Sequence, residues 1–172
     1  MDAMSLDERL PSRRELVFES LGLGIIPTML LAPAVALGDT VSFREGVIQQ
    51  EVDFKASPER VYRALTSDRE FRAFSGADAK IQAERGGAFT LFDGLIIGCN
   101  VELTPNRQIV QAWRARQWAP GVYSIVRFDF TAHESGTRVV LEQVGFPLDS
   151  GAALEAGWTR FYWRPLERYL RA

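Results

Sequence analysis

The chain has 172 residues, which fits one domain of ordinary size together with a targeting segment. Hydrophobic residues make up 47% and charged residues 24%, and these ordinary values argue against a disordered chain and against a polytopic membrane protein. The formal net charge is -2, and the sequence has no stripe of lysine and arginine interleaved with aromatic residues. We therefore do not expect a nucleic acid as a partner.

The N-terminal segment has the layout of an export signal: a polar stretch with arginines, an apolar stretch and then small residues. Arg13 and Arg14 stand ahead of the apolar stretch, within residues 12–17 (SRRELV), and this motif resembles the twin-arginine signal. The resemblance implies a bacterial protein that folds in the cytoplasm and is then exported to the periplasm. Such a protein meets the membrane only transiently, through its signal peptide.

The apolar stretch, residues 21–36, is interrupted by glycine and proline and is shorter than the roughly 20 residues that a spanning helix needs. Ala34 and Ala36 are small residues of the kind that a signal peptidase accepts, so cleavage is expected after Ala36. An amphipathic N-terminal helix docked on the domain is the alternative, and it implies a cytoplasmic protein. The predicted organisation is a signal peptide at 1–36, a linker at 37–46 and one domain at 47–172.

The folded part begins with a strand followed by two short helices. Residues 47–54 change to a period of two, which predicts a half-buried strand. Ser57 is a good N-cap and Pro58 suits the first helical position, so a helix begins there. A second short helix ends at Ser75 and Gly76.

Six further strands follow, separated by turn residues such as those of Asp93-Gly94. The connections are too short for parallel pairing, so neighbouring strands are expected to pair antiparallel in one sheet. The expected strands are 79–83, 89–92, 95–103, 109–116, 123–131 and 138–145.

Alternation along these strands assigns one face of the sheet to the core, because successive side chains point to opposite faces. Arg114, Arg127 and Glu142 then face solvent, as expected for a sheet with one wet face. The expected inner-face residues are Phe89, Leu91, Ile97, Cys99, Val101, Leu103, Ile109, Trp113, Val126, Phe128, Phe130, Val139 and Leu141.

The segment 151–170 has apolar residues at helical spacing and is the only stretch long enough to cover that face. Pro165 lies inside this helix, so a kink or a break is expected near Phe161 and Tyr162. The predicted fold is therefore α+β, of the helix-grip type. A curved antiparallel sheet wraps around a long C-terminal helix, with two short helices after the first strand.

Three blocks of sequence resemble a known family. They are residues 87–94 (GAFTLFDG), residues 109–114 (IVQAWR) followed by Trp118, and Gly157-Trp158 leading to Phe161-Tyr162-Trp163. In this order they resemble the C-terminal domain of the activator of heat-shock-protein-90 ATPase and its bacterial single-domain relatives in the START-like superfamily. The resemblance implies the helix-grip fold and, for a co-chaperone, a part in the stress response.

Residues suited to catalysis are scarce. His133 is the only histidine and stands in an expected turn, and Cys99 is the only cysteine and alternates with apolar neighbours. We therefore expect no catalytic residue, no metal site and no cofactor, and a protein that is not an enzyme.

The aromatic residues predict a ligand pocket between the sheet and the last helix, although the same residues can simply fill a core. The candidate pocket residues are Phe89, Leu91, Cys99, Gln111, Trp113, Phe128, Trp158, Phe161 and Tyr162. The expected function is an exported, non-catalytic domain that binds a hydrophobic or amphipathic small molecule there.

Two alternatives stay open. A chaperone-binding, ATPase-regulating protein would use exposed side chains, for which the candidates are Arg114, Arg116, Arg127 and Trp118. An enzyme of cyclase or hydratase type needs a polar side chain aimed into a deep pocket, and the candidates are Glu102, Gln111, Arg114 and Tyr162.

Overall fold

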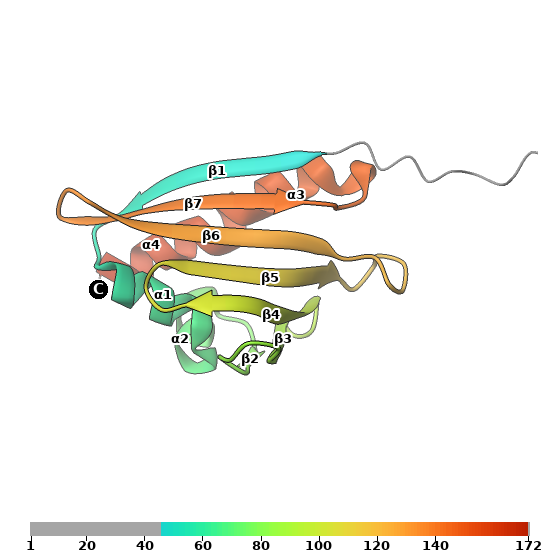
Figure 1. Ribbon diagram of the computed structural model, residues 1–172, viewed down its shortest axis with the longest axis horizontal. Coiled ribbons are helices and arrows are strands. Elements are labelled where there is room, and N and C mark those ends of the chain that lie inside the picture. Colours follow the sequence, from blue (N-terminus) through green and yellow to red (C-terminus); the bar gives the residue numbers. More distant parts are fainter. Residues whose placement is uncertain (1–45, 172) are drawn as a thin grey trace, which may run out of the picture. The chain divides into compact units, whose positions relative to one another are not determined.

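A computed structural model describes residues 46–171 (Figure 1). The predicted signal peptide, with Arg13, Arg14, Ala34 and Ala36, lies outside the described residues, and so does nearly all of the predicted linker. Across residues 46–171, no helix combines the length and the apolar character needed to cross a membrane.

The order of elements follows the predicted one: a strand, two short helices, six strands and a C-terminal helix. The elements are β1 (Val47–Phe54), α1 (Pro58–Thr66), α2 (Asp68–Ser75), β2 (Lys80–Ile81), β3 (Ala88–Leu91), β4 (Ile96–Thr104), β5 (Gln108–Ala115), β6 (Ser124–His133), β7 (Gly136–Val144), a 3-10 turn (Leu148–Ser150), α3 (Gly151–Gly157), a π-helical turn (Trp158–Trp163) and α4 (Arg164–Arg171).

The strands form one antiparallel sheet in the order β1-β7-β6-β5-β4-β3-β2. Figure 1 shows the C-terminal helix lying across one face of this curved sheet, with α1 and α2 near one end of it. The inner face, which carries the buried side chains, is the face that this helix covers. The predicted α+β helix-grip fold is confirmed.

The two short helices begin and end as their sequences predict. The Ser57 hydroxyl accepts a hydrogen bond from the backbone N–H of Arg60 at 3.3 Å, and Pro58 follows as the first helical residue. Gly76 ends α2 in the left-handed conformation, with φ of 74°.

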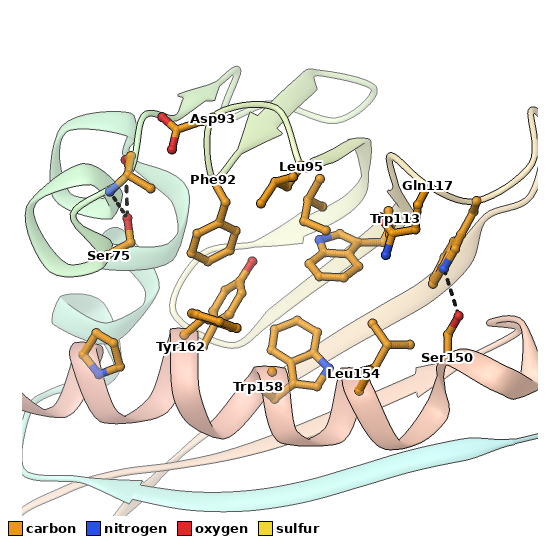
Figure 2. A pocket seen from close by; sticks show the side chains of 18 of the residues that line it. Ser75, Phe92, Asp93, Leu95, Trp113, Gln117, Ser150, Leu154, Trp158 and Tyr162 are labelled. Atoms are coloured by element: carbon orange, nitrogen blue, oxygen red, sulfur yellow. Dashed lines mark hydrogen bonds between the residues drawn. The ribbon is translucent and has the colours of Figure 1, made fainter.

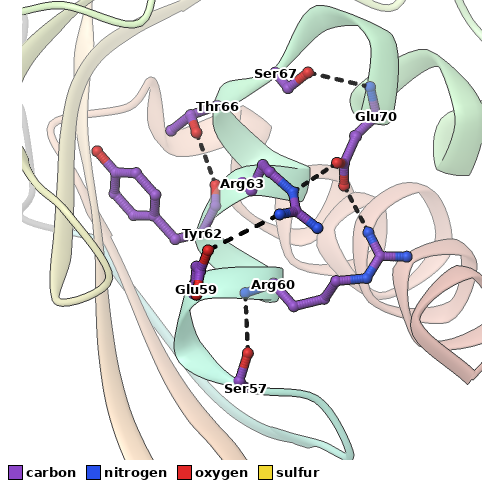
Figure 3. A network of polar contacts seen from close by, with 8 residues as sticks. All are labelled: Ser57, Glu59, Arg60, Tyr62, Arg63, Thr66, Ser67 and Glu70. Carbon is purple, nitrogen blue, oxygen red and sulfur yellow. Dashed lines mark hydrogen bonds and ion pairs between the residues drawn. The ribbon is translucent and has the colours of Figure 1, made fainter.

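A buried carboxylate joins α1 to α2 (Figure 3). Glu70 is only 5% exposed, and it accepts hydrogen bonds from Nη1 of Arg60 at 2.8 Å and from Nε of Arg63 at 2.7 Å. A buried charge is tolerated when it is paired and hydrogen-bonded in this way. The two ion pairs of Glu70 hold α2 against α1. The Phe71 ring of α2 packs edge-on against Tyr162 of the C-terminal helix at a centroid distance of 5.6 Å.

A β-bulge in β4 changes which of its residues face the core. The register shifts between Asn100 and Glu102. Before the bulge, Gly98 pairs with the buried Phe89 and Trp113, so Gly98 faces inward and Cys99, one residue on, faces outward.

The inner-face assignments of Ile97, Cys99 and Val101 were therefore wrong, because a strict period of two cannot be carried through a bulge. Val101 is 42% exposed, whereas Asn100 is buried in its place. Leu103 lies beyond the bulge, where the parity has changed, and it packs against the core as predicted.

The C-terminal helix continues past Pro165 instead of breaking. The π-helical turn Trp158–Trp163 stands where the kink or break was expected, and the backbone N–H of Arg164 bonds to the carbonyl of Thr159. Pro165 has no N–H to donate to the carbonyl of Phe161, four residues earlier, and a wider turn accommodates this lost bond without a break.

Candidate functional site

Tryptophan and tyrosine side chains from the sheet and the helix pack together on the inner face. The rings of Trp113 and Trp158 stack with centroids 5.1 Å apart and an interplanar angle of 24°. Tyr162 and Trp163, both from the π-helical turn, lie 4.4 Å and 5.8 Å from the Trp158 ring. The π-helical turn thus places three large aromatic side chains against the sheet.

A chain of buried hydrogen bonds holds this aromatic cluster in place. The Trp158 indole donates to Oε1 of Gln143 at 2.8 Å, and Nε2 of Gln143 donates to the Ser124 hydroxyl at 2.9 Å. That hydroxyl donates to the backbone carbonyl of Trp113 at 3.3 Å. Gln143 and Ser124 have no exposed surface, so these bonds form without competition from water.

Beside this cluster, a cavity of about 650 Å³ lies between the C-terminal helix, the β3–β4 turn and the loop after β5 (Figure 2). Its apolar walls include Phe92, Leu95, Trp113, Leu154, Trp158 and Phe161. The polar and charged side chains in its lining are Ser75, Asp93, Gln117, Asp149 and Ser150, in addition to Tyr162. Leu95 and Phe161 are 57% and 50% exposed, so the cavity opens to solvent beside them.

The β3–β4 turn has an unusual backbone conformation at the cavity wall. Phe92, Asp93 and Gly94 have positive φ angles of 53°, 57° and 81°. The left-handed region is unfavourable for residues with a side chain, at about 1 kcal/mol or more each. Asp78 holds the turn: its backbone carbonyl accepts from the Asp93 N–H at 3.1 Å, and its N–H donates to Oδ1 of Asp93 at 3.0 Å.

The loop after β5 contributes Trp118 to the opposite wall. Trp118 is only 5% exposed, and its indole donates to the Ser150 hydroxyl at 3.1 Å. Arg114 donates to the backbone carbonyl of Trp118 at 2.8 Å. The expectation that Trp118 is an exposed contact residue was wrong, because the loop folds its ring onto the start of the C-terminal helix.

Two polar groups of the aromatic cluster have no side-chain hydrogen-bond partner among the described residues. The indole N–H of Trp113 is buried and has no acceptor. The Tyr162 hydroxyl makes no side-chain hydrogen bond within residues 46–171, and burial raises its pKa well above the ordinary value. It therefore keeps its proton and remains a hydrogen-bond donor at neutral pH.

The structure brings together only part of the predicted pocket set. Trp113, Trp158, Phe161 and Tyr162 line the cavity. The remaining candidates lie elsewhere: Phe89, Leu91 and Phe128 pack inside the core, Gln111 is buried and donates to Oδ1 of Asn100 at 3.0 Å, and Cys99 faces away from the helix.

Sequence reasoning missed Phe92, Leu95 and Leu154 as cavity-lining residues. Phe92 and Leu95 flank a turn, where alternation along a strand no longer tells which way a side chain points. The run of turn residues at Asp93-Gly94 was the available signal that the chain reverses there.

The outer face of the sheet carries a continuous apolar row. Cross-strand pairing aligns one residue from each of six strands, and the pairs follow one another across the sheet. We call this set the outer apolar row: Val47, Val144, Ile125, Ala112, Cys99 and Ala88. Val47 and Ile125 are 56% and 42% exposed, and Tyr123, 46% exposed, stands near the row.

A charged row lies next to the outer apolar row. Arg127 pairs with Glu142 across β6 and β7, and its guanidinium is 2.9 Å from Asp129 and 3.5 Å from Glu142. Arg127 and Arg114, both candidates for partner contacts, are thus engaged within the domain, whereas Arg116 is exposed.

Within residues 46–171, no three histidine, cysteine or acidic side chains gather as a metal site would require. His133 lies at the end of β6, where its Nε2 is 3.0 Å from Nη2 of Arg138. Arg138 also holds both carboxylate oxygens of Asp53, at 2.8 and 2.9 Å, and hydrogen bonding to Arg138 lowers the pKa of that carboxyl. This exposed cluster lies on the edge pair of strands β1 and β7 and does not line the cavity.

A sheet that grips a helix, with an aromatic cavity between them, defines a START-like domain of the helix-grip class. The particular family follows from sequence: the profile described as "Activator of Hsp90 ATPase homolog 1-like protein" matches residues 55–171, and the chain belongs to this family.

Named relatives agree with this assignment. The human activator of 90 kDa heat shock protein ATPase homolog 1 is 31% identical over 115 residues, which are 67% of this chain and 34% of the relative. A Dictyostelium discoideum homologue is 37% identical over 109 residues, 63% of this chain and 28% of the relative. The chain thus spans about a third of the length of the curated relatives that it matches.

Solved structures share the fold. The crystal structure of an HSP90 activator from Plasmodium falciparum aligns with a TM-score of 0.65 and 29% identity, over 74% of this chain and 96% of that one. The solution structure of the Aha1 dimer from Colwellia psychrerythraea gives a TM-score of 0.63 at 23% identity, over 73% and 96% of the two chains, a likeness of fold.

Proposed function

We propose that this domain binds a hydrophobic or amphipathic small molecule in the cavity between the sheet and the C-terminal helix. The observation that carries the proposal is the cavity itself, about 650 Å³ in volume and walled mainly by aromatic and aliphatic side chains. Small-molecule sites have volumes of roughly 300–1,000 Å³ and few polar groups, which orient the ligand.

The proposed role is non-catalytic. The carboxyl groups in the cavity lining already have local partners, since Asp93 accepts from the Asp78 backbone and Asp149 from the Ser150 hydroxyl. Gln111, a candidate for cyclase or hydratase chemistry, is bonded to Asn100, and Glu102 is exposed at the bulge. These contacts give the groups structural roles, and this supports binding over general acid–base catalysis.

A tryptophan inserted at the cavity is expected to block binding. Ala153 is exposed and lines the cavity, so the indole of Ala153→Trp occupies space that a ligand needs. We expect affinity for a hydrophobic fluorescent naphthalene probe to fall by about tenfold or more, which corresponds to about 1.4 kcal/mol.

The matched control is Ala152→Trp, at the neighbouring exposed position of α3, which does not line the cavity. Its affinity for the probe should stay within about twofold of the wild type. Equal affinities for both variants, or no saturable binding to the wild type, would count against a ligand in this cavity.

The proposal includes export by the twin-arginine route, on the sequence of residues 1–36. The full chain made in a bacterium is expected in the periplasm with Leu37 as its first residue. The double variant Arg13→Lys, Arg14→Lys should remain in the cytoplasm at full length, because the paired arginines are the recognised feature. Compartment fractionation and intact-mass measurement test this, and a full-length, cytoplasmic wild type would contradict it.

Chaperone binding is the second candidate function, and a specific observation favours it. The human and Dictyostelium relatives carry the names of activators of a 90 kDa heat shock protein ATPase. The outer apolar row gives this domain an exposed apolar strip beside charged residues, a surface of the kind that protein partners cover. This role requires a cytoplasmic protein and fails if the chain is exported.

A charge placed in the outer apolar row separates the two functions. If the domain stimulates the ATPase of a 90 kDa heat shock protein from the same organism, Ile125→Asp should abolish that stimulation. Binding of the partner would then bury an unpaired carboxylate at the contact. Ala156→Asp, exposed on α3 and outside the cavity lining, is the control. Retained stimulation in Ile125→Asp would remove this surface as the contact.

A further inference from the structure

One indole N–H in the domain is left without an acceptor. The chain has four tryptophans, and three donate side-chain hydrogen bonds: Trp118 to Ser150, Trp158 to Gln143 and Trp163 to Gln50. Trp113 is 4% exposed, and its Nε1 is buried with no partner. An unmet buried donor is destabilising, so such a group in a native fold calls for an explanation.

The Trp113 ring, which carries the unpartnered nitrogen, lines the cavity near the ring of a second donor, Tyr162. The rings of Trp113 and Tyr162 have centroids 6.5 Å apart. Figure 2 shows the Trp113 nitrogen and the Tyr162 hydroxyl turned toward the same part of the cavity, beside Phe92 and Leu95. One acceptor atom with two lone pairs, such as a carbonyl oxygen, can accept from both donors.

The charge of the lining selects against anions. Among the described residues, no lysine, arginine or histidine lines the cavity, whereas Asp93 and Asp149 do. A carboxylate ligand would lose its hydration without meeting a cation, and it would face these two acidic groups. The acceptor that fits is therefore uncharged.

The walls favour a flat molecule. Trp113 and Trp158 stack on each other, and Phe92 lies with its ring centroid 5.3 Å from Tyr162 and 6.3 Å from Phe161. Aromatic faces and edges contribute about 0.5–1.5 kcal/mol beyond burial when another ring packs against them. A planar ring system uses these surfaces better than a flexible alkyl chain.

We propose that the cavity is selective for planar, uncharged molecules whose carbonyl oxygen accepts hydrogen bonds from the Trp113 indole and the Tyr162 hydroxyl. This inference rests on the proposed ligand-binding function and names its ligand class. The Trp113 nitrogen has almost no exposed surface, so the cavity wall that covers it has to move as the carbonyl enters.

Two matched probes test the inference on the purified full chain: a dimethylaminonaphthalene that carries a propionyl ketone, and its analogue with a propyl group in place of the ketone. We expect the ketone to bind about tenfold tighter or more, since two added hydrogen bonds contribute about 1 kcal/mol each. In Trp113→Phe and in Tyr162→Phe, the ratio of the two affinities should fall by about threefold to tenfold.

A measurement on the wild type removes any dependence on how the variants fold. In proton–nitrogen NMR spectra, the Trp113 indole resonance should move downfield on addition of the ketone and not on addition of the propyl analogue. Dodecanoate, an apolar anion, should displace the ketone poorly.

The outcomes separate the inference from the function on which it rests. If neither naphthalene binds, the proposed ligand-binding function fails. If both bind equally and the Trp113 indole resonance ignores the ketone, the cavity binds ligands but the inferred carbonyl contact is wrong. If dodecanoate displaces the ketone as well as an unlabelled ketone does, the selection for uncharged ligands is wrong.

Discussion

Gly98→Ala is expected to lower the free energy of unfolding by about 3 kcal/mol or more. Gly98 faces inward from β4, between Phe89 on one neighbouring strand and Trp113 on the other. A Cβ atom at this position would lie 2.1 Å from the Ala112 carbonyl oxygen and 2.4 Å from Cζ of Phe89.

Neither contact can be relieved cheaply. The Ala112 oxygen belongs to the backbone of β5, so relief requires the two strands to separate and their hydrogen bonds to lengthen. The Phe89 ring is 3% exposed and has little room to turn. The substitution would also disturb Trp113, which pairs with Gly98 and lines the cavity.

Urea unfolding followed by tryptophan fluorescence measures the loss, and Gly94→Ala is the control. Gly94 also has a special conformation, with φ of 81°, but a Cβ atom there would meet nothing within 4 Å. Its substitution should cost only the left-handed strain, about 1–2 kcal/mol. If both variants lose the same free energy of unfolding, close packing is not the reason that position 98 requires glycine.

The helices and the strand order could be predicted from local signals. Ser57 and Pro58 mark the start of α1, Gly76 marks the end of α2, and short turns allow only antiparallel neighbours. The pairing of β1 with β7 was not predicted, since no local signal joins strands so far apart in sequence.

The site was harder to predict because it depends on departures from periodicity. The bulge at Asn100 reversed the parity of β4 and moved Cys99 to the outer face. The same register aligns Cys99 with Ala112 and Ile125, so the outer apolar row appears only when cross-strand pairing is known. Periodicity within one strand carries no information about such a row.

Gln143→Leu is expected to lower the free energy of unfolding by about 2–4 kcal/mol and to weaken ligand binding as well. Gln143 has no exposed surface, and its amide bridges the Trp158 indole and the Ser124 hydroxyl. Leucine has a similar volume but no polar atoms, so it leaves the Trp158 N–H buried without an acceptor.

The effect on binding follows from the place of Trp158 in the cavity wall. Trp158 stacks on Trp113, and the hydroxyl of Ser124 connects Gln143 to the backbone of Trp113. Without the amide, Trp158 loses the hydrogen bond that fixes its indole, and the Ser124 hydroxyl, which bonds to the backbone of Trp113, loses its donor. A site held on loosened groups binds less tightly. Gln49→Leu, at an exposed position of β1, makes the same chemical change and should shift stability by less than about 0.5 kcal/mol. Paired urea unfolding and probe titration on the two variants measure both effects. A stability loss in Gln143→Leu with unchanged probe affinity would mean that the bridge supports the core without shaping the cavity.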